Sequence, residues 1–269
     1  MLAKGKKLTI KTDSEELTGT LLSYSLDNSS NALHLDRYPN ECFYLKEVVD
    51  IADKPECAYS EIEAILERFE LLRNLRVPTE QYIGYVLVPG FNKVIKKSWE
   101  DPFIVTKNVG FDLEIIDSEI ADIKWTDFSV EQLKHFVNLA SDYMGRIHNA
   151  GWVHTHPHNG NFTINHKRVL SLIDIAEMVS LDSEKETAHF SYDYGFLFGS
   201  TITTLVNAMN LDHPSYEKAF YESICRVLRH YLPEDEVKNE AIAIFNKIPC
   251  YSRNICGNKN HINKELLNI

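Results

Sequence analysis

The feature of the sequence that most constrains its fold is a change of pattern near residue 110. Before that point, the chain consists of short segments with partial alternation or with many aromatic and β-branched residues, as strands have. After it, apolar residues recur at helical spacing over long segments. Strands followed by helices predict an α+β fold with two lobes. The 269 residues are enough for two lobes and a sizeable core.

The first part of the chain predicts five strands and one helix. The first three strands should form an antiparallel meander; they are ELTGTLLSYSL (16–26), NALHLDRY (31–38) and CFYLKEVVDI (42–51). A helix is expected over 58–75, because Ile62, Ile65, Leu66, Phe69 and Leu72 fall on one stripe. Two more strands follow, QYIGYVLVPGF (81–91) and FIVTKNVGFDLEII (103–116), with KKSWEDP between them as a polar connection.

The second part predicts helices around one inserted hairpin. A helix over 128–150 has Asp127 or Ser129 as its N-cap and Gly151 just past its C-terminus. A loop then leads to two short strands, FTI (162–164) and VLSLIDI (169–175). From about residue 190 the pattern is helical again, in three segments: 189–209, 215–232 and 236–248.

Charge, hydropathy and cysteine content bound the class of protein. A formal charge of −11 argues against nucleic acid or an anionic membrane as the main partner. No apolar run approaches the roughly 20 residues that a membrane helix needs, and the N-terminus has no apolar segment of a secretory signal. Five scattered cysteines without CxxC spacing suggest reduced thiols. We therefore expect a cytoplasmic protein.

The stretch GWVHTHPHNGNFTI (151–164) allows a metal site. His154, His156 and His158 alternate, His166 lies nearby in the sequence, and imidazole binds zinc, copper, nickel or iron. Against this interpretation, Pro157 interrupts a strand, and no HExxH or carboxylate–histidine cluster supplies further ligands. A histidine-ligated metal protein stays as a minor alternative.

The same stretch also fits a phosphoryl-transfer site. A helix is followed by a loop with Asn161, a short hairpin and then Asp174 at the end of an apolar strand. Phosphoryl transfer needs a lysine on the nucleotide phosphates, oxygen ligands for Mg²⁺ and a residue that orients the acceptor hydroxyl. Asn161 and Asp174 offer the hard oxygen donors that Mg²⁺ prefers. A hairpin that brings them together would place both on one ion.

GWVHTHPHNGNFTI followed by LSLIDIAEM resembles the catalytic loop and metal-binding segment of the protein-kinase-like superfamily. The subgroup pattern is H-G-D-P-H-x-G-N-F followed by a strand with I-D, which is similar to bacterial lipopolysaccharide core heptose kinases. It is more loosely similar to ubiquinone-biosynthesis kinase-like proteins and aminoglycoside phosphotransferases. The resemblance implies a small β-rich N-lobe over residues 1–108, a helical C-lobe over 109–269, and ATP in the cleft between them.

The resemblance also implies roles for individual residues. Asn161 and Asp174 would bind Mg²⁺, and His158 and Gly160 match the P-H-x-G part of the pattern. In FYLKEV, Lys46 takes the place of the lysine that contacts the phosphates, on the third expected strand.

Further along the chain the resemblance assigns supporting roles. Glu61 would form an ion pair with Lys46. Lys107, Asn108 and Val109 would meet the adenine through backbone groups, and Asp193 in SYDYGFLFGSTI would brace the catalytic loop backbone.

The sequence departs from the family pattern at two positions. His156 stands where the family has its catalytic aspartate; a neutral imidazole can act as a general base near pH 7 but lacks the negative charge. The turn at Asp27–Ser30, where the family has a Gly-rich loop, contains no glycine, so its backbone amides could not approach phosphates closely.

Two functions from different classes follow. The first is an ATP- and Mg²⁺-dependent phosphotransferase with His156 as the base. Its acceptor would be a lipopolysaccharide-core sugar, a protein or a small alcohol. The second is a pseudokinase that senses nucleotide or binds a protein partner without transferring phosphate.

Overall fold

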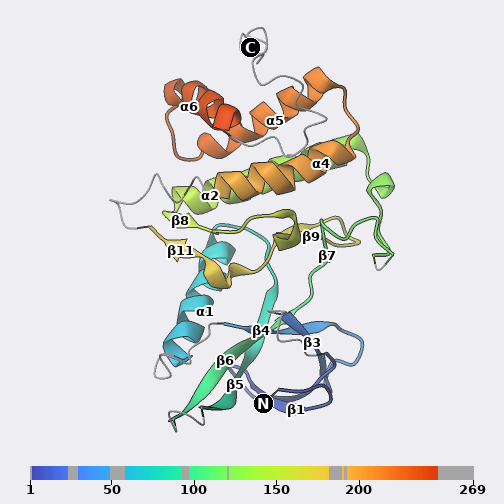
Figure 1. Cartoon of the computed structure of the whole chain (residues 1–269), viewed down its shortest axis with the longest axis vertical. Helices are drawn as coiled ribbons and strands as arrows, with labels where there is room; N and C mark the ends of the chain where they lie inside the picture. The colour runs from blue at the N-terminus through green and yellow to red at the C-terminus, as the bar shows by residue number, and fades with distance from the viewer. Residues whose placement is uncertain are drawn as a thin grey trace. The chain divides into compact units, whose positions relative to one another are not determined.

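The computed structural model describes residues 2–23, 30–48, 58–92, 97–119, 121–181, 190 and 193–247. The chain divides into two compact units (Figure 1). Unit 1 contains Met1–Asn74 and Thr79–Val109, and unit 2 contains Leu75–Pro78 and Gly110–Ile269. The boundary predicted between residues 108 and 109 lies next to this division, whereas the short segment Leu75–Pro78 was expected in the first lobe.

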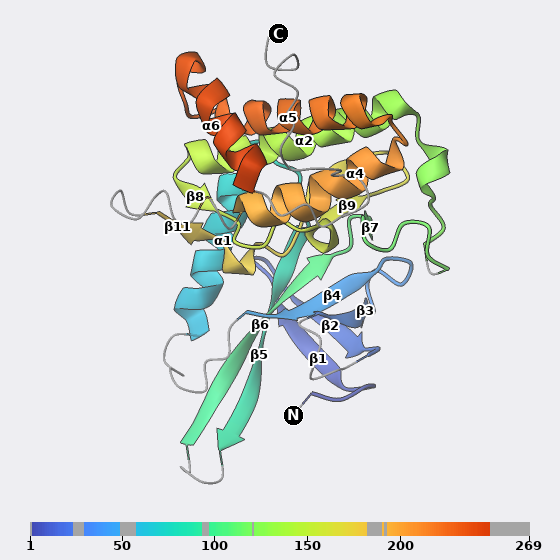
Figure 2. The same ribbon diagram turned by 45° about the horizontal axis from the view of Figure 1, so that its top comes forward.

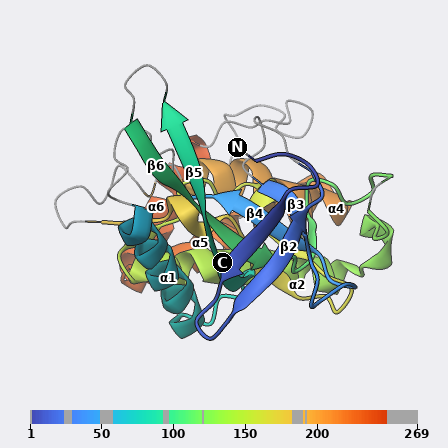
Figure 3. The ribbon, with the colours of Figure 1, turned by 90° about the horizontal axis from the view of Figure 1, so that it is seen from below.

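Unit 1 is a closed antiparallel barrel in the strand order β1-β2-β3-β4-β6-β5 (Figure 3). Its strands are β1 (Lys7–Lys11), β2 (Glu16–Leu21), β3 (Ser30–Leu35), β4 (Phe43–Glu47), β5 (Gln81–Asn92) and β6 (Lys97–Lys107). The predicted meander is confirmed in β2, β3 and β4. A core of mostly Leu, Ile, Val and Phe side chains fills the barrel.

Strand β1 closes the barrel, and the sequence did not predict it. Leu8 and Ile10 point inward between exposed lysines, so the apolar alternation is only two residues long. The strand meets β5 through Lys11, which pairs with Tyr85. A side chain at Gly84 would place its Cβ 2.3 Å from the carbonyl oxygen of Lys11, so this close approach requires glycine.

Strands β5 and β6 form a long ribbon that extends past the barrel (Figure 2). The segment KKSWEDP, predicted as a polar connection, belongs to β6 from Lys97 onward and pairs with β5. That expectation is wrong because backbone hydrogen bonds across a hairpin do not depend on side-chain polarity. Residues 24–29, which contain most of the predicted turn at Asp27–Ser30, lie outside the described residues.

Helix α1 (Ala58–Asn74) packs on β6 within unit 1. Ile62, Ile65 and Leu72 of the predicted stripe are buried, and Leu66 and Phe69 are half-buried. The predicted helix is therefore confirmed together with its apolar face. Its last turn ends where the chain passes into Leu75–Pro78 of unit 2.

Unit 2 is built on helices that pack side by side (Figure 2). They are α2 (Val130–Asn149), the π-helical η5 (Leu197–Ile202), α4 (Thr203–Ala208), α5 (His213–Leu228) and α6 (Glu234–Lys247). Helix α2 contacts α4 and α5, and α5 contacts α6. The predicted N-cap Ser129 forms a capping box with Gln132, and Gly151 follows the helix with φ +75°.

Short strands and 3₁₀ turns complete unit 2. The strands are β7 (Phe111–Asp112), β8 (Trp152–Val153), β9 (Phe162–Ile164), β10 (Leu170–Leu172) and β11 (Val179–Ser180); the turns are η2 (Trp125–Asp127), η3 (Asn159–Asn161) and η4 (Ile175–Glu177). The predicted hairpin is β9–β10, and β7 extends it to three strands. Among the described residues, no helix is long and apolar enough to cross a membrane.

Candidate active site

The backbone of the loop after β8 is held by a buried carboxylate. Both oxygens of Asp193, which has no exposed surface, accept backbone hydrogen bonds: from His154 N at 2.9 Å and from Thr155 N at 2.7 Å. The Nε2 atom of the buried His148 lies 2.8 Å from the same carboxylate. Charge-assisted bonds of this kind are stronger than neutral ones. Asp193 therefore braces the loop as predicted, and it holds Thr155 in a left-handed conformation with φ +75°.

His154 is a structural residue of this loop. Its side chain is fully buried, and its Nε2 lies 3.0 Å from the carbonyl oxygen of Ile173. A carbonyl oxygen only accepts, so Nε2 carries the ring proton. Burial lowers the pKa of His154 below 6.5, against the opposing charge of Asp193. The ring is thus held neutral and joins the loop to the end of the β9–β10 hairpin.

His156 lies two residues further on and is half exposed. Its Nδ1 atom is 2.6 Å from Oε2 of Glu177, at the end of η4, and 3.1 Å from the hydroxyl of Thr155. The ring also contacts Phe196, with ring centroids 5.1 Å apart. The residue at the position of the expected catalytic aspartate is therefore paired with a carboxylate.

Asn161 is buried and tied to the same loop. Its Nδ2 donates to the carbonyl oxygen of His156 at 2.8 Å, so the orientation of the amide is fixed. Its backbone carbonyl accepts from Ile173 N at 2.9 Å. Because Ile173 directly precedes Asp174, this bond extends the β9–β10 pairing by one step. It brings Asn161 and Asp174 to the same end of the hairpin.

Asp174 follows β10 and precedes η4. It is half-buried and adopts a left-handed conformation, with φ 61° and ψ 52°, which is unusual for a residue other than glycine. Backbone strain of this kind concentrates at functional sites. An amide oxygen and a carboxylate at one end of a hairpin suit a Mg²⁺ ion, so the donor set fits the ion that the sequence suggested.

The rest of the loop is fastened to η5 and α4. The Oγ of Ser200 accepts from Asn159 N at 3.0 Å and donates to its Oδ1 at 2.8 Å. The hydroxyl of Thr201 donates to Pro157 O at 2.8 Å. His158 caps η3 by accepting from Gly160 N at 3.1 Å. These bonds give the loop a single shape around Asn161.

The alternating histidines do not form a metal-ligand set. In the part of the chain that the structure describes, no group of three or more His, Cys, Asp or Glu side chains could hold an ion. One ring nitrogen of each histidine is engaged: Nε2 of His154 and Nδ1 of His158 with backbone groups, and Nδ1 of His156 with Glu177. The histidine-ligated alternative therefore has no structural support among the described residues.

In unit 1, Lys46 on β4 forms a buried ion pair with Glu80. Its Nζ lies 3.0 Å from Oε1 and 2.9 Å from Oε2, and the side chains are 8% and 4% exposed. Lys46 is on the fourth strand rather than the third because β1 precedes the predicted meander. Glu80 stands just before β5. The structure thus pairs Lys46 with the carboxylate of Glu80. The ion pair predicted between Lys46 and Glu61, on α1, stays a prediction.

The predicted adenine-contacting segment is the last part of unit 1. Lys107 ends β6, where its backbone pairs with Phe43 on one side and Gln81 on the other, and its ammonium lies 2.7 Å from Glu41. Asn108 N donates to Cys42 O at 3.0 Å. The roles of Lys107 and Val109 in binding adenine stay predictions.

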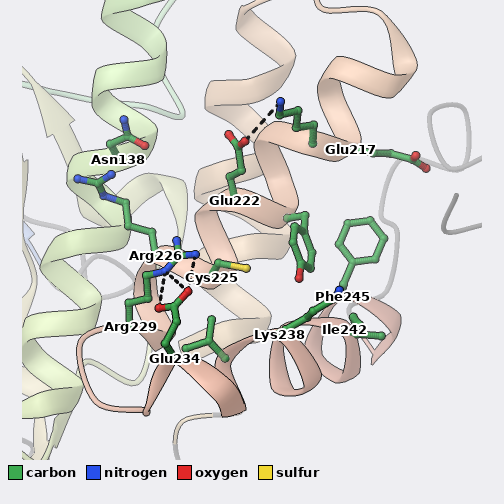
Figure 4. A pocket seen from close by; sticks show the side chains of 13 residues that line it. Asn138, Glu217, Glu222, Cys225, Arg226, Arg229, Glu234, Lys238, Ile242 and Phe245 are labelled. Atoms are coloured by element: carbon green, nitrogen blue, oxygen red, sulfur yellow. Dashed lines mark hydrogen bonds and ion pairs between the residues drawn. The ribbon is translucent and has the colours of Figure 1, made fainter. Parts of the chain in front are cut away.

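A separate hollow of about 540 Å³ lies among α2, α5 and α6 (Figure 4). Its arginines are already engaged, Arg226 with Asp142 and Arg229 with Glu234. Burial raises the pKa of the Cys225 thiol, so this cysteine is a poor nucleophile. None of the residues that line the hollow belongs to the loop after β8 or to the β9–β10 hairpin.

Sequence reasoning missed two acidic residues, Glu80 and Glu177. Glu80 lies in VPTEQY, between a helix and a strand, with no pattern around it to indicate burial. Glu177 directly follows Asp174-Ile175-Ala176, and this position next to the metal-binding segment is the one signal that could have singled it out.

No protein-family model and no curated protein matches the sequence. The fold is similar to that of a Toxoplasma gondii rhoptry antigen kinase domain, with TM-score 0.53 and 14% identity over 90% of this chain and 88% of that chain. A second similar structure is ROP2 of Toxoplasma gondii, described as a virulence factor with a protein-kinase fold and no enzymatic activity. Its TM-score is 0.50, with 11% identity over 90% of this chain and 87% of that chain. At such low identity these likenesses show the fold alone: the chain has a two-lobed, α+β protein-kinase-like fold.

Proposed function

We propose that this protein binds Mg²⁺-ATP and transfers a phosphoryl group to a hydroxyl acceptor. The observation that carries the proposal is the pairing of Asn161 with the segment before Asp174. It brings Asn161 and Asp174 to the end of one hairpin, beside a loop that the buried Asp193 holds in place. The left-handed conformation of Asp174 at that point is in keeping with the proposal, since backbone strain of this kind recurs at functional sites.

Each residue has a separate part in the proposal. Asn161 and Asp174 would hold Mg²⁺, which neutralises charge on the phosphates when it is bound. Lys46 would contact the phosphates, with Glu80 fixing the direction of its ammonium. His156 would accept the proton of the acceptor hydroxyl, which is the task of the aspartate in the resembling family.

The acceptor class rests on the resemblance of the loop to lipopolysaccharide core heptose kinases. A sugar hydroxyl is the first candidate, and a protein or a small alcohol is the next. A half-exposed His156 is compatible with any of them, since an acceptor can reach the imidazole from outside the loop.

The second candidate function is a pseudokinase, favoured by the histidine at the position of the catalytic aspartate. Such a protein would bind nucleotide or a protein partner without transferring phosphate. ROP2, with its protein-kinase fold and no enzymatic activity, is an example of that combination.

Nucleotide binding is tested by thermal unfolding with ATP, with and without Mg²⁺. A ligand at ten times its Kd stabilises the native state by about 1.4 kcal/mol, which is a rise in Tm of a few degrees. We expect this rise only with Mg²⁺ present, and we expect Asp174→Ala and Asn161→Ala to abolish it. Asp122→Ala, at an exposed carboxylate of the same unit, serves as the control and should keep it.

No stabilisation at millimolar nucleotide would contradict both nucleotide-dependent functions. If it occurs, release of phosphate from Mg²⁺-ATP separates them: the wild-type protein releases phosphate if it is a transferase, and His156→Ala lowers the rate. Activity that arises only in His156→Asp would identify a pseudokinase whose loop has lost its base.

A further inference from the structure

The short contact between His156 and Glu177 joins two segments that are separate in the sequence. His156 belongs to the loop after β8, and Glu177 ends η4, just past Asp174. The distance of 2.6 Å between Nδ1 and Oε2 is that of a charge-assisted hydrogen bond. The side chains are 49% and 63% exposed, so the pair is accessible from solvent.

The neighbours of Nδ1 decide which ring nitrogen carries the proton. The carboxylate of Glu177 only accepts hydrogen bonds. The Thr155 hydroxyl, 3.1 Å from Nδ1, directs its hydrogen to the carbonyl oxygen of Glu177 at 3.4 Å. Its oxygen is therefore also an acceptor towards the ring. Two acceptors at Nδ1 place the proton on that atom and leave a lone pair on Nε2.

The orientation of the ring is held from several sides. The Asn161 amide binds the carbonyl oxygen of His156, and the bonds of Asp193 hold the preceding residues. Phe196 packs against one side of the imidazole. The backbone and the ring are therefore positioned by contacts that do not involve Nε2.

We propose that Glu177 is a positioning residue that makes His156 an effective base, so that the pair replaces the catalytic aspartate. This inference rests on the proposed transferase function. The proton of the acceptor hydroxyl passes to Nε2 and the acceptor oxygen forms a bond to the γ-phosphorus. The bond from that phosphorus to the bridging oxygen breaks, and its electron pair leaves with the nucleoside diphosphate. Glu177 supplies the negative charge that histidine lacks and stabilises the imidazolium.

The first test reads the tautomer directly and does not need turnover. In protein with ¹⁵N-labelled histidine, the resonances of His156 are assigned by their loss in His156→Gln. We expect the proton on Nδ1 in the wild-type protein, the same in Glu177→Asp, and a mixture of tautomers in Glu177→Ala. Glu119→Ala, at an exposed glutamate elsewhere in unit 2, is the control and should leave the tautomer unchanged.

The second test reads phosphate release from Mg²⁺-ATP. Because a general base contributes about 10²–10⁴-fold, loss of its positioning carboxylate should lower kcat at least about tenfold. KM should change less than about twofold, since Glu177 does not contact the nucleotide in the proposal. Glu177→Asp should recover part of the rate and Glu177→Gln should not.

The outcomes separate the two proposals. A tautomer that does not respond to Glu177→Ala, or a wild-type proton on Nε2, overturns the role of Glu177 whatever the activity. Unchanged kcat in Glu177→Ala overturns it as well. If the tautomer responds but the wild-type protein releases no phosphate, the transferase function fails and with it the catalytic role of the pair.

Discussion

Two contacts of similar length between a nitrogen side chain and a carboxylate lie in different surroundings, Lys46–Glu80 in unit 1 and His156–Glu177 in unit 2. The first is almost wholly buried, with side chains 8% and 4% exposed, whereas the second is about half exposed. A buried pair has lost its hydration, so its partners depend on each other, while water can replace either partner of an exposed pair. The difference separates a contact that supports the fold as well as the proposed chemistry from one that supports the proposed chemistry alone.

A third contact, His148–Asp193, is fully buried and serves both purposes. Its carboxylate also holds the loop that carries His156. The buried contact thus holds the backbone of the loop from the interior, and the exposed pair lies at its surface.

The largest expected effect comes from breaking the buried pair of unit 1. Glu80→Leu removes the carboxylate that the structure places on the Lys46 ammonium, and we expect a loss of about 3–5 kcal/mol in the free energy of unfolding. The double variant Lys46→Met/Glu80→Leu should recover most of the loss because it removes both charges of this pair from the interior. The double-mutant cycle is measured by urea unfolding of four proteins: the wild type, Lys46→Met, Glu80→Leu and the double variant. Equal losses in the Glu80 variant and the double variant would contradict the interpretation.

An effect of comparable size is expected at Asp193. Asp193→Ala leaves the backbone amides of His154 and Thr155 without their acceptor, at a cost of about 1–3 kcal/mol for each buried group. Asp193→Asn keeps one acceptor oxygen and should lose less. The free energy of unfolding measures the difference, and hydrogen exchange at Thr155 N should become faster in the alanine variant. Unchanged exchange there would argue against the bracing role.

The smallest effect on stability is expected at the exposed pair. Glu177→Gln should change the free energy of unfolding by less than about 1 kcal/mol, because exposed ion pairs contribute about 0–1 kcal/mol. Urea unfolding at low and at high salt is the measurement, and any loss should shrink as salt screens the pair. A loss as large as that of Glu80→Leu would remove the contrast between the two contacts.

Much of the fold could be predicted because local patterns agree with it. The periodicity of α1 and α2, the N-cap at Ser129 and the position of Gly151 are local properties, and the structure contains all of them. Strand β1 was missed because only Leu8 and Ile10 carry its pattern. The strand exists because it completes the barrel: it pairs with β2, which follows it directly, and with β5, which lies far along the chain.

The candidate site divides in the same way. Short motifs predicted the type and order of Lys46, Asn161 and Asp174. They also predicted that Asp193, within its helical segment, braces the loop. The sequence alone thus determined the α+β class and the residue types that the loop carries. Only the tertiary structure decided which carboxylates meet Lys46 and His156. Glu80 and Glu177 reach them through pairing and packing between segments far apart in the chain, and such contacts leave no periodic signal in the residues that make them.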